Sequence, residues 1–191
     1  MPRSGEDARR RLQQAALDLY AERGFDATTT AEIAARAGVT ERTYFRHFAD
    51  KREVLFDGEA ALQAALAAAV SSAPDDAPPL AVLRRAFRAA VPTLEAARTV
   101  TEARHRVISA SPALRERDLA KRQSLKSTLA AALEDRGLPG RVARLAADVG
   151  LVAWAEVVDR WLDDPSASLE ALLTREFDDL AGLMSDVAPG R

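Results

Sequence analysis

Apolar residues recur every three or four positions along almost the whole chain, which is the spacing of helix faces that pack on a core. Proline, glycine and capping residues divide this pattern into segments. They predict helices over residues 6–23, 29–37, 40–48, 51–71, 78–108, 112–136, 140–163 and 167–187. Within residues 78–108 we expect a kink or break at Pro92, because proline cannot donate to the carbonyl four residues back. The sequence therefore predicts an all-α protein.

A tight turn separates the two short helices predicted over residues 29–37 and 40–48. The Thr29 hydroxyl can accept a hydrogen bond from the Glu32 amide while the Glu32 carboxylate accepts one from the Thr29 amide, an arrangement called a capping box. Gly38 stands where a helix end needs a left-handed residue, and Thr40 can cap the next helix. Together with the helix over residues 6–23, this segment predicts a three-helix domain that contains a helix-turn-helix.

The second short helix has one apolar side and one basic side. At roughly 100° per residue, Tyr44 and Phe48 share one side, and Arg42 and Arg46 lie almost opposite and face outward. The flanks, where a helix seated in a DNA groove meets the two phosphate backbones, carry Thr43, Phe45 and His47. This arrangement is typical of a recognition helix that enters the DNA major groove.

These residues resemble the TetR family of one-component transcriptional regulators over about residues 8–56. The resemblance rests on Gly24-Phe25, Thr29-Thr30, Ile33-Ala34, Ala37-Gly38-Val39, Thr40, Thr43, Phe45, His47, Phe48 and Lys51. It implies an all-helical homodimer. A helix-turn-helix domain over residues 1–52 would bind DNA, and residues 53–191 would form an effector-binding and dimerisation domain.

The resemblance and the outward face of the second helix together imply a set of DNA contacts. They are Thr29, Thr30, Thr40, Glu41, Arg42, Thr43, Tyr44, Phe45, Arg46, His47 and Lys51. Arg42 favours a bidentate contact to a guanine. Two positions depart from the family pattern: Phe45 replaces a tyrosine whose hydroxyl usually bonds a phosphate, and Tyr44 stands where a buried aliphatic residue is usual. Tyr44 is either a DNA contact or a core residue with a hydrated hydroxyl.

The C-terminal part carries the expected dimer interface and effector site. In the family the last two helices pair with their symmetry mates as a four-helix bundle, and here Ala146 and Gly150 offer a flat strip for close approach. The resemblance also implies a cavity for a largely apolar small molecule. We expect that cavity near Pro92, with His105, Arg104 or Arg106 as a polar anchor; the alternative is a filled core. Candidate lining residues are Phe87, Val91, Leu94, His105, Ile108, Leu125, Leu129 and Trp154.

Charge and composition add little to this picture. The net charge is −2, with ten basic and eight acidic residues over 1–52 and seventeen basic against twenty-one acidic residues over 53–191. The chain has no cysteine, which excludes disulfides and thiolate metal sites and suits a reducing interior. The N-terminus is charged and predicts no signal peptide, and the uncharged stretch 60–74 is too short to span a bilayer. We expect a cytoplasmic protein.

Other functional classes fit the sequence less well. Glu102 and His105 could form half of a di-iron site in a helix bundle, but the only other histidine, His47, lies in the DNA-binding segment. A hydrolase would need a nucleophile beside a base, and the sequence has no Gly-x-Ser-x-Gly elbow and no cysteine. We therefore predict no metal, no cofactor and no enzyme activity. The predicted function is a repressor that binds a palindromic operator as a dimer and is released by a small molecule. The sequence is also compatible with a helical interaction module, an activator or a ligand-independent regulator.

Overall fold

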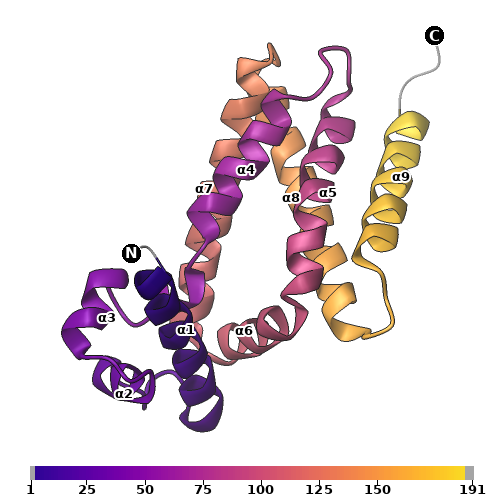
Figure 1. Cartoon of the computed structure of the whole chain (residues 1–191). Helices are drawn as coiled ribbons and strands as arrows, with labels where there is room; N and C mark the ends of the chain where they lie inside the picture. The colour runs from indigo at the N-terminus through magenta and orange to yellow at the C-terminus, as the bar shows by residue number, and fades with distance from the viewer. Residues whose placement is uncertain (1–2, 188–191) are drawn as a thin grey trace. The chain divides into compact units, whose positions relative to one another are not determined.

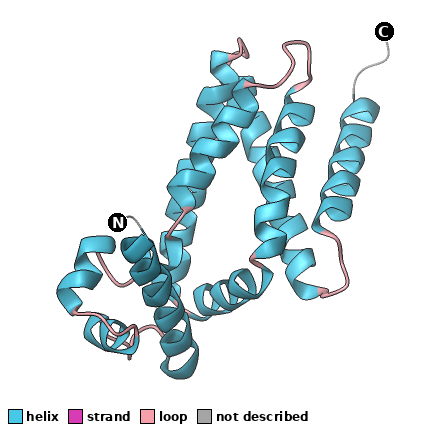
Figure 2. Cartoon of the chain, viewed as in Figure 1, coloured by secondary structure: helices cyan, strands magenta, loops and turns pink. Residues whose placement is uncertain are grey.

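The computed structural model describes residues 3–187, and side chains over residues 5–184. The described residues form nine α-helices and one 3-10 helix, with no strand among them (Figures 1 and 2). The helices are α1 Arg3–Arg23, α2 Thr30–Arg36, α3 Glu41–His47, η1 Glu53–Phe56, α4 Glu59–Ser71, α5 Pro79–Ala96, α6 Arg98–Ala110, α7 Pro112–Asp135, α8 Gly140–Asp163 and α9 Leu169–Val187. The predicted all-α fold is confirmed.

The chain folds as two compact units. The first comprises the chain up to Glu59 together with Thr99–Lys121, and the second comprises Ala60–Arg98 together with the chain from Arg122 onward. Helix α6 and the first part of α7 therefore pack with the N-terminal helices. The predicted division after residue 52 describes function rather than packing, and it stays a prediction.

The core of the first unit lies behind the helix-turn-helix. Apolar side chains of α1, α2, α3 and η1 pack together, and α6 and α7 add Val107, Ile108 and Leu114 to the same cluster. The N-terminal members of the cluster are Leu12, Ala15, Ala16, Leu17, Leu19, Tyr20, Phe25, Ile33, Ala34, Ala37, Tyr44, Phe48, Val54, Leu55 and Phe56. The short helices α2 and α3 thus rest on a core much larger than either could supply alone.

The core of the second unit is built mainly from α5, α8 and α9. Phe87, Trp161, Leu173 and Phe177 are all buried within it. Gly150 of α8 is also buried, and a Cβ atom there would lie 2.7 Å from Leu83 Cδ1. Gly150 therefore lets α5 approach α8 inside one chain. The expectation that Gly150 forms a flat strip for the symmetry mate was wrong.

Pro92 does not break its helix. Helix α5 runs from Pro79 through Pro92 to Ala96. A proline at this point removes only the hydrogen bond to the Arg88 carbonyl, and the helix ends one turn later. The predicted break is therefore absent from this described helix.

The predicted helix over residues 51–71 is divided in two. Gly58 has a positive φ of 85° and separates η1 from α4, which begins at Glu59. By length and composition alone, the segment Glu53–Ser71 could cross a membrane. In the structure this glycine interrupts it, and Leu66 and Val70 of α4 pack into the core of the second unit.

Candidate DNA-binding surface and ligand pocket

Local capping fixes the start of α2. The Glu32 amide donates to Thr29 Oγ1 at 3.2 Å, and the Thr29 amide donates to Glu32 Oε2 at 2.9 Å. The Thr29 hydroxyl also donates to Glu32 Oε2 at 2.9 Å, and the bonds from the Thr29 amide and then the Thr29 hydroxyl lower the pKa of the Glu32 carboxyl. Gly38 takes the left-handed conformation with φ 68°, and Thr40 Oγ1 accepts from the Thr43 amide at 3.2 Å. The predicted caps and turn are confirmed.

Helix α3 turns one face inward and exposes the other. Tyr44 and Phe48 are buried in the core, while Arg42, Phe45 and Arg46 are exposed. The Tyr44 hydroxyl donates to the Asp50 carbonyl at 3.1 Å, and burial raises the pKa of Tyr44. Tyr44 is therefore a core residue, and it does not belong to the surface available to DNA.

The N-termini of α2 and α3 are joined directly. Thr30 Oγ1 donates to Glu41 Oε1 at 2.5 Å, and Thr29, Thr40 and Glu41 are all exposed at the surface. The two helix starts thus lie side by side and expose polar side chains at the same part of the surface.

Lys51 serves a different purpose from the one predicted. Its ammonium group donates to the carbonyls of Phe25, Asp26 and Thr28 at 2.9, 3.4 and 3.2 Å, and it lies 4.2 Å from the centre of the Phe25 ring. An ammonium group has three donors, so the protein itself uses all of them. Lys51 thus connects the segment after α3 to the turn between α1 and α2. In this arrangement none of its three N–H donors is left to bind a phosphate.

His47 is half-buried at the end of α3. Its Nε2 atom is buried and has no hydrogen-bond partner among the described residues. Burial lowers the pKa of His47, and the nearby guanidinium groups of Arg46 and Arg9 lower it further. In the free protein these effects favour the neutral imidazole.

An ion-pair cluster lies behind the helix-turn-helix in the first unit. Glu53 of η1 pairs with Arg117 at 2.5 Å and with Lys121 at 3.3 Å. Lys121 also lies 3.6 Å from Glu59, whose pKa is raised by burial. These contacts tie η1 and the first residue of α4 to α7.

The predicted effector residues are divided between the two units. Phe87, Val91, Leu94, Leu125, Leu129 and Trp154 belong to the core of the second unit, where the rings of Phe87 and Trp154 stack with centroids 5.0 Å apart. Ile108 is instead buried in the core of the first unit, and His105 is exposed. Arg104 reaches the Leu55 carbonyl of the first unit at 3.5 Å. The expected polar anchors thus belong to the first unit, whereas most of the expected apolar lining belongs to the core of the second unit.

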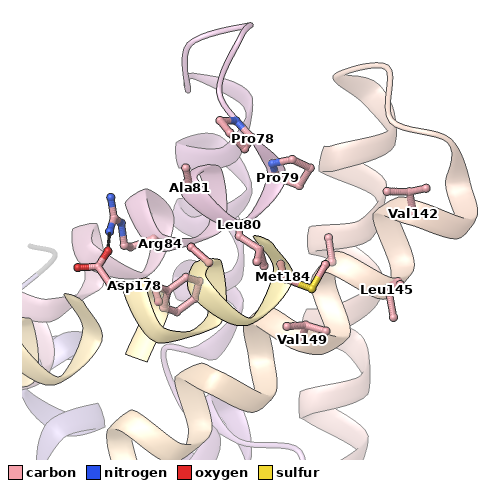
Figure 3. A pocket seen from close by; sticks show the side chains of 13 residues that line it. Pro78, Pro79, Leu80, Ala81, Arg84, Val142, Leu145, Val149, Asp178 and Met184 are labelled. Carbon is pink, nitrogen blue, oxygen red and sulfur yellow. Dashed lines mark hydrogen bonds and ion pairs between the residues drawn. The ribbon is translucent and has the colours of Figure 1, made fainter. Parts of the chain in front are cut away.

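The second unit has an open pocket of about 590 Å³ elsewhere, between α5, α8 and α9 (Figure 3). Its lining is almost entirely apolar, and an ion pair between Arg84 and Asp178 at 2.6 Å lies at its edge. The lining residues are Pro78, Pro79, Leu80, Ala81, Arg84, Val142, Leu145, Ala146, Val149, Phe177, Asp178, Ala181 and Met184. None of the predicted effector residues lines this pocket. The pocket arises because the apolar stripe of α9 continues from the buried Phe177 to the exposed Met184.

Helices α8 and α9 also expose apolar side chains. On α8 these are Val142, Leu145 and Val152, and on α9 they are Leu183 and Met184. Val152 and Leu183 do not line the pocket. Exposed apolar residues gathered on neighbouring helices commonly mark a surface that another molecule covers.

Sequence comparisons agree with this geometry. Residues 12–57 match the family described as "Bacterial regulatory proteins, tetR family", and residues 77–185 match the "MftR C-terminal domain". The HTH-type transcriptional regulator TcmR of Streptomyces glaucescens is 36% identical over 81 residues, which cover 42% of this chain and 36% of TcmR. The HTH-type transcriptional repressor Rv3405c of Mycobacterium tuberculosis is 44% identical over 55 residues, or 29% of each chain. The chain thus matches about a third of the length of these relatives.

The fold is shared with solved structures. The fatty acid degradation regulator FadR of Bacillus halodurans superposes with a TM-score of 0.63 at 20% identity, and the alignment covers 96% of this chain and 97% of FadR. The capped helix-turn-helix with a basic outer face defines a DNA-binding protein. The chain belongs to the TetR family of transcriptional regulators. Members of this family are soluble, bind DNA and dimerise, and they are not enzymes.

Proposed function

We propose that this protein is a cytoplasmic repressor that binds a palindromic operator as a homodimer. The observation that carries the proposal is the exposed face of α3, where Arg42 and Arg46 stand opposite the buried Tyr44 and Phe48. The capped start of α2 supplies polar groups beside this face. The protein Rv3405c, which is 44% identical to this chain over 55 residues, is named a transcriptional repressor, and this supports repression rather than activation.

The dimer is proposed to form through α8 and α9. Val152 and Leu183 are exposed, apolar and unconnected with the pocket. A two-fold interface presents the same residues on both subunits, so a small apolar surface is used twice. Two copies of α3 would then enter successive major grooves with their centres about 34 Å apart.

Replacing Arg42 by alanine tests the DNA-reading face. Because Arg42 is exposed on α3, we expect Arg42→Ala to relax the preference at one operator base pair by about 1–3 kcal/mol. The measurement is selection of sites from random DNA, followed by affinity for each single-base variant. Arg36→Ala is the matched control, since Arg36 on α2 pairs with Glu22. If Arg42→Ala lowers affinity equally for every sequence, Arg42 contacts the backbone instead.

The effector is proposed to be a neutral, mostly apolar small molecule that binds between α5, α8 and α9. Ligand pockets of this type usually measure about 300–1,000 Å³ and are lined by apolar groups, and the pocket here falls in that range. Asp178 already neutralises Arg84, so the pocket offers no unpaired charge of its own to a charged ligand. The effector must prefer the released state, and DNA must then weaken effector binding by the same factor.

Filling the pocket tests this assignment. Ala181 is exposed and lines the pocket, so we expect Ala181→Trp to occupy the space and abolish ligand binding while the fold is kept. Neutral apolar compounds are screened for an increase in Tm of the parent, and the hits are tested for release of DNA. Arg175→Trp, exposed on the same helix and outside the lining, is the control. Hits that stabilise Ala181→Trp as well as the parent would place the effector elsewhere. A parent without any such ligand would favour a ligand-independent regulator.

A further inference from the structure

Phe45 is an unexpected residue on the face of α3. Its side chain is 52% exposed, while its neighbours one turn earlier, Glu41 and Arg42, are charged. A phenyl ring can neither donate nor accept a conventional hydrogen bond, so it cannot bind a phosphate as a tyrosine hydroxyl would. An exposed aromatic ring on a polar reading surface offers an apolar contact to the DNA.

The ring is supported from within the protein. Phe45 and Tyr44 contact edge to face, with ring centroids 5.5 Å apart and an interplanar angle of 81°. Tyr44 is itself buried and is held by its hydrogen bond to the Asp50 carbonyl. The Phe45 ring is therefore held in place by Tyr44 and projects from α3 as an exposed apolar side chain.

The DNA major groove offers one main apolar group at the base edges, the 5-methyl group of thymine. We propose that Phe45 determines operator specificity by contacting a thymine methyl close to the base pair that Arg42 reads. This inference rests on the proposed DNA-binding function and adds to it a named base and a named residue. Arg42 and Phe45 lie three residues apart and so share a side of the helix, which lets them read neighbouring positions.

The test removes the methyl group and leaves the rest of the base unchanged. A preferred site is selected from random DNA with the full-length protein, and each thymine is then replaced by deoxyuridine. We expect one position where the replacement weakens binding about fourfold per half-site, and about fifteenfold in both half-sites, as for one buried methyl-sized group. Every other thymine should tolerate the change.

Variants of Phe45 connect the effect to this side chain. Phe45→Ala and Phe45→Gln should bind the thymine site more weakly and lose the sensitivity to deoxyuridine at that position. Phe45→Tyr keeps the ring and should keep the sensitivity, and so should Arg42→Ala. The Tm of each variant shows that the fold is retained, and Phe45→Gln serves where Phe45→Ala is unstable.

Two results would overturn the inference: tolerance of deoxyuridine at every position, or unchanged sensitivity in both Phe45→Ala and Phe45→Gln. Either result leaves the DNA-binding function intact, because a preferred site was found. Failure to select any preferred DNA would instead refute the proposed function itself.

Discussion

Replacing Val152 by glutamate is expected to convert the dimer into monomers. Val152 is 72% exposed on α8, so the substitution leaves the core of the protomer untouched. In a two-fold interface the change introduces two charges into one apolar contact. Burying an unpaired charge costs several kcal/mol, and each 1.4 kcal/mol is tenfold in an equilibrium constant, so we expect dimer dissociation to rise by more than about a hundredfold. Operator affinity should fall with it, since a monomer holds only one half-site.

Leu119→Glu is the matched control for this experiment. Leu119 is 66% exposed, lies on α7 in the first unit, and should accept a charge without affecting the dimer. Light scattering and sedimentation report the mass of each variant. A dimer that survives Val152→Glu would contradict the assigned interface, and dissociation by Leu119→Glu would move it to α7. Gly150 and Leu173 would be poor probes, because both are buried within one chain.

Lys51→Met should destabilise the helix-turn-helix rather than remove a phosphate contact. The methionine would remove the ammonium donor from the carbonyls of Phe25, Asp26 and Thr28. The Phe25 carbonyl would still accept from the Thr28 amide at 3.3 Å. Hydrogen bonds to charged groups contribute about 1.5–3 kcal/mol each, and partial exposure reduces that figure. We therefore expect the free energy of unfolding to fall by about 2–3 kcal/mol. At a temperature where the variant is folded, the dependence of DNA affinity on salt should match the parent.

Arg52→Met is the control that distinguishes a stabilising role of Lys51 from a phosphate contact. Arg52 is the next cation along the chain; it is exposed and pairs with Asp50 at 2.8 Å. Exposed pairs of this kind contribute about 0–1 kcal/mol, so its loss should barely change stability. If Lys51 were a phosphate contact, Lys51→Met would keep the stability of the parent and lower the salt slope by about 1.

The elements that depend on neighbouring residues were predictable from the sequence. Thr29, Gly38 and Thr40 act on groups within five residues, so the caps and the turn follow from local chemistry. The alternation of Arg42 and Arg46 with Tyr44 likewise fixes which face is exposed. The role of Lys51 could not be read in this way, because its partners lie 23 to 26 residues earlier in the chain.

The pocket between α5, α8 and α9 was not predicted from the sequence, for a similar reason. Pro92 suggested a break, but a proline so close to the end of α5 costs a single hydrogen bond. The pocket depends instead on how the ends of three distant helices meet, which residue spacing does not specify. One signal was present in the sequence: the apolar stripe of α9 continues to Met184, beyond the part that the core covers.

Footprinting of a selected operator with hydroxyl radicals, together with the protein-to-DNA ratio, shows whether the protein binds DNA as a dimer. We expect two protein chains per site and two protected half-sites related by a two-fold axis. Their centres should lie on one face of the duplex, one helical turn or about 34 Å apart. A single protected half-site bound by one chain, or protection that is the same on every sequence, would contradict the claim that this protein reads DNA as a dimer through α3.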